Sequence, residues 1–460
     1  MAVCSSISIS HVEYLRFDAD FYHPKYLQEL ETWRTLDERI GVAKLSYLIS
    51  APVRTGRTPS SRHIKDEDEI VPFIKTDGVR EGRINFDSAG ELPKRVLNGT
   101  DFIPADSVVV TIIGATPEIV GRAAIVRDAD PRCVTNQNVA VITTNSKCDP
   151  YFLTAYFQNR FGRDQLWRHS RRTEQVNLNC REVERVLVPT PDISLQNEIG
   201  DLVRASFAAT DDSESLYSQA QQLLESELGL DKLRFDKPVG YTARFSDLEL
   251  SHRSDAQHYQ PRFTQLLEHI SQYPTKRIRE IRRYNRRGIQ PVYIDDGTYA
   301  VVNSQHLGPK HINYDGLQKT TEHIFNASPE AHIQPDDLLI YTTGAYIGRT
   351  NVYLDEAPAF ASNHVNILRL SSDIDHAYMA MVFQSIIGQF QTQKHARGSA
   401  QAELYPADID KFMVPLLPPD KQQEIGNLFR ESLTKQRESA QLLDQAKSRV
   451  EQLIEEAVRA

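Results

Sequence analysis

The sequence predicts an α+β protein made of two tandem copies of one unit, each followed by a long helix. The last segment contains no proline after Pro419 and no glycine after Gly426, so it can form one continuous helix. A similar segment, residues 191–207, precedes it by 226 residues, with Gln196 matching Gln422. Because each helix has an apolar seam that needs cover, the simplest arrangement is a pair packed on each other.

The seam of the last helix alternates in steps of three and four residues, which is typical of a coiled coil. Its members are Phe429, Leu433, Ala440, Leu443, Val450, Ile454 and Ala457, filled out by Gln436 and Lys447. At about 1.5 Å per residue, this helix is on the order of 55 to 60 Å long. That length exceeds one small globular domain, so we expect the helix to act as a spacer.

The repeat also covers the segments before the helices. The matching blocks, in order, are 17–26 with 254–263, 71–85 with 298–313, 103–122 with 333–349, and 135–142 with 361–368. Short apolar, β-branched runs bounded by Pro, Gly and Asp predict strands, and the segments that begin at Asp149 and Asp375 have helical spacing. The predicted division is a first domain at 1–190, a central helix at 191–228, a second domain at 229–415 with a linker at 229–253, and a C-terminal helix at 416–460.

Composition narrows the class of protein. The chain has 460 residues, of which 40% are hydrophobic and 25% charged, as in ordinary globular proteins. Its four cysteines form no C-x-x-C pair, which argues against a disulfide framework or a zinc site and fits a reducing cytoplasm. We expect no membrane segment. The net charge of −9 argues against non-specific binding of polyanions, although the segments 160–172 and 276–288 are strongly basic.

Motifs for catalysis are missing from the sequence. There is no phosphate-binding G-x-x-x-x-G-K-[ST], no G-x-S-x-G, no H-E-x-x-H and no [ND]-P-P-[YF]. Paired carboxylates such as Asp295 and Asp296 lie at turns, where aspartate is common for backbone reasons. We therefore expect a non-catalytic chain with no metal site and no cofactor of its own.

Side chains suited to nucleic acid are better represented, and they fall in matched loops of the two halves. Arginine can grip guanine or a phosphate with two hydrogen bonds, and amides can read adenine. The candidate DNA-binding residues are Arg54, Arg57, Thr58, Arg62, Lys75, Thr76, Arg80, Arg171, Arg172, Gln175 and Asn177 in the first half, and Arg283, Arg286, Arg287, Ser304, Gln305, His306, Tyr346, Lys394, Arg397, Ser399 and Gln401 in the second. The framework is repeated while these loops differ, as expected of two modules that read different targets.

Several linked motifs carry a family resemblance. They are GRTPSSR at 56–62, VPFIKTDGV at 71–79, TNQNVAVI at 135–142, GAYIGR at 344–349, ARGSAQAEL at 396–404 and KQQEIGNLF at 421–429. Together they resemble the specificity subunits of Type I restriction-modification systems. The resemblance implies two target recognition domains, each reading one half of a split double-stranded DNA sequence, with two antiparallel helices between them as a ruler. It also implies two methyltransferase subunits, which would hold S-adenosylmethionine, and possibly restriction subunits as partners.

Two other interpretations remain open at this point. A specificity subunit can also serve a related phage-defence system that methylates DNA without a Type I nuclease. Alternatively, the duplicated units bind protein as an interaction scaffold, and the basic segments are solvated faces. The scaffold predicts no salt-dependent binding to duplex DNA, whereas a recognition subunit predicts affinity that falls with salt.

Overall fold

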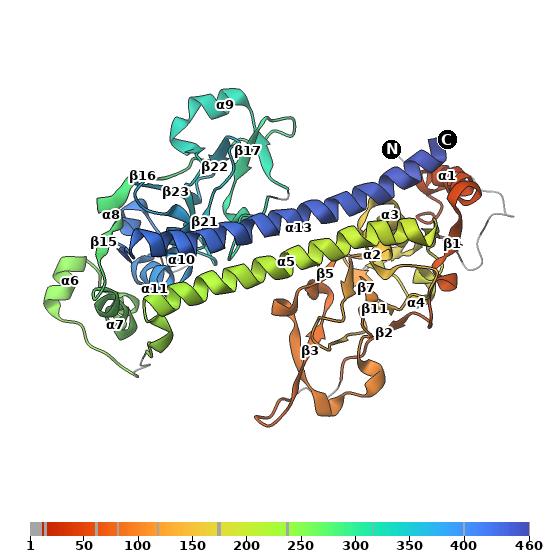
Figure 1. Ribbon diagram of the computed structural model, residues 1–460, viewed down its shortest axis with the longest axis horizontal. Helices are drawn as coiled ribbons and strands as arrows, with labels where there is room; N and C mark the ends of the chain where they lie inside the picture. Colours follow the sequence, from red (N-terminus) through yellow and green to blue (C-terminus); the bar gives the residue numbers. More distant parts are fainter. Residues whose placement is uncertain are drawn as a thin grey trace. The chain divides into compact units, whose positions relative to one another are not determined.

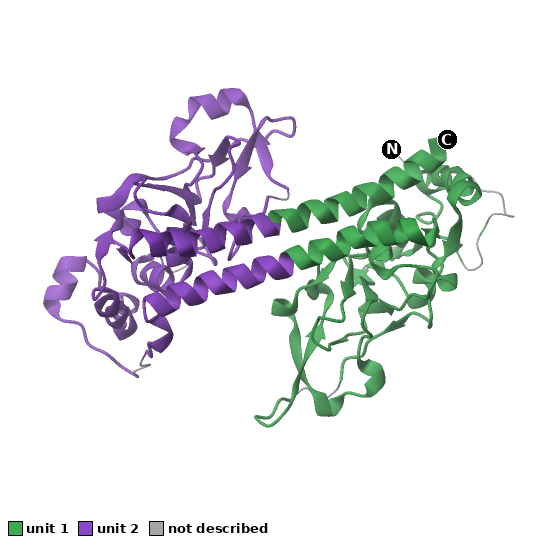
Figure 2. Ribbon diagram, in the orientation of Figure 1, with its two compact units in different colours: residues 1–209, 437–460 green, residues 210–436 purple. Residues whose placement is uncertain are grey.

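The computed structural model describes residues 12, 16–59, 63–80, 82–116, 119–172, 176–235, 239–314, 316–398 and 401–459. The chain forms two compact units, which Figure 2 shows in different colours. Unit 1 contains residues 1–209 and 437–460, and unit 2 contains residues 210–436. Each unit therefore includes part of both long helices, α5 (Ile193–Glu227) and α13 (Pro419–Arg459).

Unit 1 is built on a four-stranded antiparallel sheet in the order β2-β11-β7-β9, with a three-stranded sheet, β10-β3-β6, beside it. Its other helices are α1 (Pro24–Ile40), α2 (Pro150–Gln158), α3 (Arg160–His169) and α4 (Cys180–Val183). Its strands are β1 (Val42–Lys44), β2 (Arg54–Thr55), β3 (Ile70–Ile74), β4 (Val79–Arg80), β5 (Arg83–Ile84), β6 (Gly90–Pro93), β7 (Ser107–Thr111), β8 (Ile113–Gly114), β9 (Ala123–Val126), β10 (Val134–Thr135), β11 (Val139–Ile142), β12 (Arg171–Arg172), β13 (Val176–Asn177) and β14 (Leu187–Pro189).

The run of valines in β7 is apolar without alternation because both faces of the sheet are covered. Helix α2 lies beside β7 (Figure 1), and Val108 and Val110 pack into the core that includes this helix. Val109 points to the opposite face and packs with Val139 and Val141. Successive side chains of a strand point to opposite faces, so a continuous apolar run is expected when neither face meets water.

Unit 2 repeats this plan with a four-stranded sheet in the order β16-β23-β20-β21 and a second one in the order β18-β17-β22-β19. Its other helices are α6 (Phe245–Ser251), α7 (Pro261–Ile270), α8 (Ile278–Ile281), α9 (Glu322–Ala327), α10 (His376–Gln384), α11 (Ile386–His395) and α12 (Pro406–Ile409). Its strands are β15 (Thr275–Arg277), β16 (Arg282–Arg287), β17 (Tyr299–Val302), β18 (Gln318–Thr320), β19 (His332–Ile333), β20 (Leu338–Tyr341), β21 (Thr350–Val352), β22 (Ala359–Ala361), β23 (Val365–Leu370) and β24 (Met413–Pro415). In β20, Leu338 and Ile340 face the helices while Leu339 faces the opposite core.

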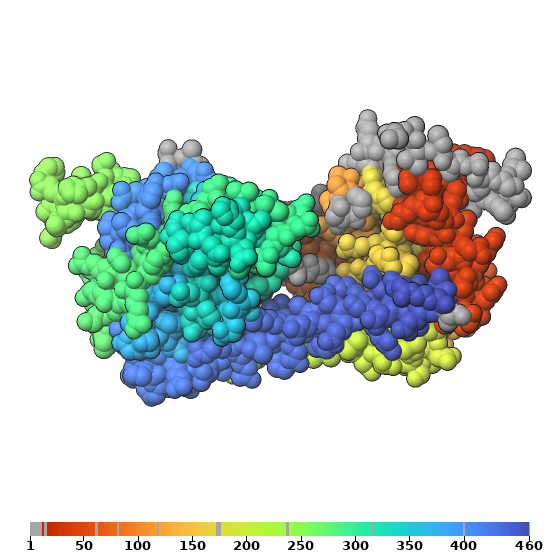
Figure 3. Space-filling view, turned by 90° about the horizontal axis from the view of Figure 1, so that it is seen from above, coloured from red at the N-terminus to blue at the C-terminus, as the bar shows by residue number. Residues whose placement is uncertain are grey.

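The predicted fold class is confirmed: the chain is a duplicated α+β structure with two long helices. The two helices pack antiparallel within each unit. In unit 2, Glu227 near the end of α5 pairs with Lys421 near the start of α13 at 3.0 Å, and Tyr217 contacts Phe429. One face of α13 lies on the surface, where Figure 3 shows it in blue.

The composition of the helix seam differs from the predicted one. Ala440, expected in the seam, is exposed, whereas Ser432, Ser439 and Ala446 are buried. In unit 1 the hydroxyls of Ser206 and Ser439 lie 3.0 Å apart. Small hydroxyl-bearing residues let two helices approach closely and satisfy each other's hydrogen bonds, which an apolar pattern search does not detect.

Each long helix is fastened to its unit through one carboxylate, which is buried in unit 1 (Asp149) and half-buried in unit 2 (Asp375). In unit 1, Gln196 accepts a hydrogen bond from the backbone of Asp149 (3.1 Å) and donates to the Pro191 carbonyl (2.9 Å). Arg204 pairs with the Asp149 carboxylate, and a Cβ at Gly200 would lie 2.4 Å from Asp149 Oδ1, so only glycine fits there. The matching set in unit 2 is Gln422, Asp375, Gly426 and Arg430. This geometry explains the glutamine and the glycine that the two helix segments share.

Among the helices in the described part of the chain, none is long and apolar enough to span a membrane.

Candidate nucleic-acid interface

The predicted binding segments after α3 and α11 form a matched hairpin in each unit. In unit 1, β12 and β13 pair antiparallel with Arg171 opposite Asn177. In unit 2, Arg397 and Glu403 form the equivalent bridge, in which each backbone amide donates to the other carbonyl at 2.8 and 2.7 Å. We call residues 171–177 the first hairpin and residues 397–403 the second hairpin. The two hairpins lie 226 residues apart in the sequence, and the same positions pair in each, so the duplication includes the strand pairing of the hairpins.

The base of the first hairpin is held by a buried carboxylate. Arg171 donates from Nε to Glu182 Oε1 at 2.7 Å, and the Glu182 side chain is only 4% exposed. The same Oε1 lies 3.5 Å from the guanidinium of Arg16, which also donates to the carbonyl of His169 at 2.7 Å. Glu182 sits on α4, where its second oxygen accepts from the backbone of Asn179 at 3.0 Å. A buried charge is stable only when its oxygens are paired in this way.

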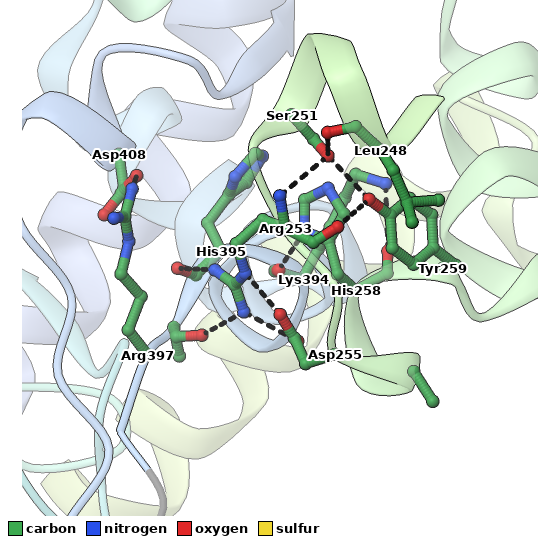
Figure 4. Close-up of polar contacts among 12 residues, drawn as sticks. Leu248, Ser251, Arg253, Asp255, His258, Tyr259, Lys394, His395, Arg397 and Asp408 are labelled. Atoms are coloured by element: carbon green, nitrogen blue, oxygen red, sulfur yellow. Dashed lines mark hydrogen bonds and ion pairs between the residues drawn. The ribbon is translucent and has the colours of Figure 1, made fainter. Parts of the chain in front are cut away.

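The base of the second hairpin is held by Asp408 of α12. Arg397 and Lys411 both donate to Asp408 Oδ1, at 2.8 and 2.9 Å. Burial alone raises the pKa of Asp408, but the hydrogen bonds from Arg397 and Lys411 outweigh it and the pKa is lowered. Arg253 takes the place of Arg16 and donates to the carbonyls of His395 and Ala396 at 3.2 and 3.0 Å (Figure 4).

Of the histidines at the hairpin entrances, His169 is buried and His395 is half-buried. His169 packs its ring edge-on against Phe21, and His395 stacks on Phe412. Burial, reinforced by neighbouring cations such as Arg168, lowers the pKa of His169 to about 3. Burial also lowers the pKa of His395 to about 3, with His258 and then Lys394 adding to the effect. The surroundings of both imidazoles therefore disfavour the cationic form.

A glycine-containing loop lies beside each hairpin. In unit 1, β13 pairs with β8, with Asn177 opposite Ile113. In unit 2, the Gly344 amide donates to the Ala402 carbonyl at 3.0 Å, and a Cβ at Gly344 would lie 3.7 Å from Gln401 Nε2. The predicted residue Tyr346 is 57% exposed on this loop, with the Arg349 guanidinium 3.8 Å from its ring centroid. The structure thus brings Gln401 next to the loop that carries Tyr346.

The early basic segments around Arg54 and Arg286 occupy equivalent places in their sheets, as their strand pairing shows. Arg54 pairs with Val141 in the first sheet, and Arg286 pairs with Ile367, which lies 226 residues after Val141, in the second. Two positions further on, a Cβ at Gly56 would lie 1.7 Å from the Thr135 carbonyl oxygen, and a Cβ at Gly288 would lie 2.0 Å from the Ala361 carbonyl oxygen. The two glycines are therefore equivalent, although the surrounding sequence makes the alignment look loose.

The early basic side chains have different local partners. Arg54 donates to the Phe102 carbonyl at 2.7 Å, and Arg57 pairs with Asp101 at 2.6 Å. Thr58 donates to Gln137 at 2.5 Å. Arg287 donates to the Leu404 carbonyl at 2.8 Å, directly after the second hairpin.

Two further second-half candidates also have partners within unit 2. Arg283 donates to Ser372 at 3.0 Å. Lys394 is half-buried and donates to the His258 carbonyl at 3.2 Å (Figure 4), and burial is the main cause of its lowered pKa.

In each unit, a basic residue that follows the third predicted set contacts a long helix. In unit 1 this set consists of Lys75, Thr76 and Arg80, and Arg83 of the same segment donates to Ser439 on α13 at 2.7 Å. In unit 2 it consists of Ser304, Gln305 and His306, and the Lys310 ammonium that follows lies 4.9 Å from the Tyr217 ring on α5.

His306 itself is buried, and its ring accepts from the Asn303 backbone at 3.1 Å, so the side chain caps its own turn. Burial lowers its pKa.

Four predicted residues cannot be placed fully. Arg62, Gln175 and Ser399 lie outside the described residues, and for Arg172 only the backbone is described.

The pattern search missed Arg16 and Arg253, which lie one residue before the matched blocks that begin at Phe17 and Ser254. The shared pattern R-x-D-A-x-x-Y would have identified them, because each arginine pairs with the aspartate two residues on.

Comparison with known proteins places the chain in a family. A model described as Type I restriction modification DNA specificity domain matches residues 47–219 and again residues 271–445. The specificity subunit of the Type I restriction enzyme StySPI from Salmonella potsdam is 17% identical over 159 residues, which are 35% of this chain and 34% of that subunit. The match therefore spans about a third of that relative's length.

Two solved structures are similar over most of the chain. The S subunit of a Type I restriction-modification system from M. genitalium has a TM-score of 0.46 and 12% identity, covering 90% of this chain and 95% of that one. The HsdS subunit from Thermoanaerobacter tengcongensis has a TM-score of 0.30 and 15% identity, covering 90% and 96%. On the family match alone, which occurs twice and accounts for most of the sequence, the chain belongs to the Type I restriction-modification DNA specificity family as an HsdS-type subunit with two specificity domains.

Proposed function

We propose that this chain recognises a bipartite sequence in double-stranded DNA and directs partner methyltransferase subunits to it. Each specificity domain reads one half of the target. The chain itself is not catalytic, and S-adenosylmethionine is bound by the methyltransferase. Two methyltransferase subunits, and in a restricting system also restriction subunits, assemble with it in the cytoplasm.

The observation that carries the proposal is the duplicated family match at 47–219 and 271–445 in a single chain. Both units present the same hairpin base, but the residues between the paired positions differ, with Arg-Thr-Glu-Gln-Val in the first hairpin and Gly-Ser-Ala-Gln-Ala in the second. Loops of different sequence on a repeated framework are suited to two different half-sites. The predicted site residues that lie beyond the paired arginines of these hairpins, and those on the adjoining loops, are proposed as the DNA contacts.

We further propose that the domains lie at 1–190 and 229–415 and that the helices at 191–228 and 416–460 set the number of unread base pairs between the half-sites. Helix α5 has 35 residues and α13 has 41. Insertion of one heptad into each helix, at matched positions, is expected to lengthen the gap while both half-site sequences stay the same. A changed half-site sequence would argue against a pure spacer.

The experiment that tests the function is co-expression of the chain with its methyltransferase partner, followed by mapping of methylated bases across the host DNA. A split motif with two defined halves and a fixed gap is expected. Binding of the purified complex to a duplex with that motif should weaken steeply as salt rises, because phosphate contacts release counterions. No new methylation together with no salt-sensitive duplex binding would support the interaction scaffold instead.

A further inference from the structure

We infer that Arg171 and Arg397 are positioning residues that fix the two hairpins, and that the side chains beyond them read the DNA. This inference rests on the proposed function and changes the part that the sequence predicted for these two arginines, which was direct DNA contact. The juxtaposition that carries it is an arginine at the first paired position of each hairpin with a buried carboxylate on the short helix that follows.

The ion pairs are equivalent in the two units. Arg171 lies 2.7 Å from Glu182, and Arg397 lies 2.8 Å from Asp408. The carboxylate side chains are only 4% and 1% exposed. Removal of either arginine from its carboxylate, for example to reach a base, would leave a buried charge with fewer partners, which is costly.

A second arginine in each unit fixes the entrance to the hairpin. Arg16 is 1% exposed and donates to the carbonyls of Arg168, His169 and Ser170 at 3.3, 2.7 and 3.3 Å. Arg253 donates to the corresponding carbonyls of His395 and Ala396 (Figure 4). These carbonyls are at the C-terminal ends of α3 and α11, where backbone acceptors have no partner within the helix. The chain therefore enters each hairpin from a fixed point.

The division of labour also appears in the sequence of the hairpins. Across the 226-residue repeat the ion pair between an arginine and a carboxylate is retained, with Arg171 matching Arg397 and Glu182 matching Asp408. The five residues between the paired positions share only Gln175 and Gln401. Four of the five places differ, as expected of side chains that read two different half-sites, whereas residues that hold the loop are expected to stay the same.

The test uses the full chain in complex with its methyltransferase. The variants are Arg171→Ala, Glu182→Gln and the double variant. The control is Gln401→Ala, which changes an exposed residue of the second hairpin that lies outside the ion pair between Arg397 and Asp408. Two readouts are made: amide hydrogen exchange of the DNA-free complex over residues 171–178, and relative affinity for duplexes in which each base of a half-site is varied in turn.

For a positioning role, Arg171→Ala and Glu182→Gln each accelerate exchange in the first hairpin without DNA, by about tenfold or more. Each relaxes every position of the first half-site, and the double variant is no worse than the single variants, because both remove one interaction. Gln401→Ala leaves exchange unchanged and relaxes one position of the second half-site. Arg397→Ala should repeat the Arg171→Ala result in the second half-site only.

Unchanged exchange in Arg171→Ala, with relaxation at a single base position and normal binding by Glu182→Gln, would overturn the inference and make Arg171 a direct reader. If the wild-type complex does not bind duplex DNA, the proposed function fails, yet the exchange data still decide whether Arg171 and Glu182 hold the hairpin. The two failures are therefore distinguishable.

Discussion

The two serine pairs of the long-helix seam occupy equivalent places in the repeat but differ in their neighbours. In unit 2, Ser213 and Ser432 each donate to the other's backbone carbonyl, at 2.8 and 2.9 Å. In unit 1, the Ser439 hydroxyl accepts from the Arg83 guanidinium at 2.7 Å, and Arg83 also donates to the Ser206 carbonyl at 2.8 Å. The block that supplies Arg83 has His311 at the matching place. The duplication thus retains a close helix contact while each unit adds its own side chains around it.

The largest expected effect comes from removing the carboxylate that fastens each long helix, Asp149 in unit 1 or Asp375 in unit 2. We call this carboxylate the helix anchor. Asp149→Ala and Asp375→Ala should each lower the free energy of unfolding by about 2–4 kcal/mol, because each change removes a helix cap and leaves an arginine without its carboxylate partner. Asp149 accepts from the amides of Tyr151 and Phe152 at 2.9 and 2.8 Å, and Asp375 accepts from that of Tyr378 at 2.8 Å. Urea unfolding followed by circular dichroism measures the loss.

Asp201→Ala is the control for this anchor, because Asp201 is exposed and pairs with the same Arg204 at 2.9 Å. Its removal should change stability by less than about 0.5 kcal/mol. A loss of stability for one of Asp149→Ala and Asp375→Ala but not for the other would show that the same geometry contributes differently to the stability of the two units.

The serine pairs of the two units should differ in their contribution to stability. Ser213→Ala with Ser432→Ala should change stability by less than about 1 kcal/mol, because only the two donating hydroxyls are lost and the acceptors are helix carbonyls that keep their bonds within the helix. Ser206→Ala with Ser439→Ala should cost about 1–2 kcal/mol more, because the Arg83 guanidinium loses an acceptor. Unfolding midpoints of the two double variants provide the comparison, and equal losses would mean that Arg83 contributes nothing at this seam.

The seam also shows where sequence reasoning stops. Helix positions and the 226-residue repeat follow from periodicity and from the glycines at 200 and 426, and the hairpins lie in the segments predicted to bind DNA. The serines of the seam were missed because a small polar residue that is satisfied across an interface resembles a surface residue in a hydropathy pattern.

The side chains that the candidate site residues contact within the fold could not be predicted from the sequence. Nothing in the sequence indicates that Arg171 meets a carboxylate on the next short helix, or that His306 turns inward to cap its own turn. A basic residue in a loop has the same signal whether it contacts DNA or an internal acid. Spacing along the chain gives the order of the elements, whereas the pairing of side chains requires the fold.

Acid should destabilise both units through the histidines at the hairpin entrances. The pKa of His169 and that of His395 are each lowered to about 3 by burial in the folded protein, against an ordinary value of 6.5. Between these values the unfolded chain binds a proton that the folded chain does not, so stability is lost as pH falls below about 6.5. At pH 5.5 each histidine should account for about 1.4 kcal/mol.

His169→Gln and His395→Gln should each flatten the dependence of thermal stability on pH between 6.5 and 5, by similar amounts in the two units. Melting temperatures across that range measure the effect. Steeper loss in either variant than in the wild-type chain would mean that the histidine is protonated in the folded state.

The smallest expected difference concerns the early basic strands, where Arg54 and Arg286 hold equivalent register positions. Arg54 is tied to the Phe102 carbonyl at 2.7 Å, whereas Arg286 is exposed, and no side-chain hydrogen bond or ion pair of Arg286 is found within the described ranges. If Arg286 contacts phosphate, Arg286→Ala should weaken duplex binding about threefold for all sequences alike and reduce the salt slope by about one. Anisotropy titrations across a range of potassium chloride give both values. Arg54→Ala, the matched variant, should leave the slope unchanged, because its guanidinium is already engaged; an equal change in both would mean that the register, rather than the exposed charge, decides which arginine meets DNA.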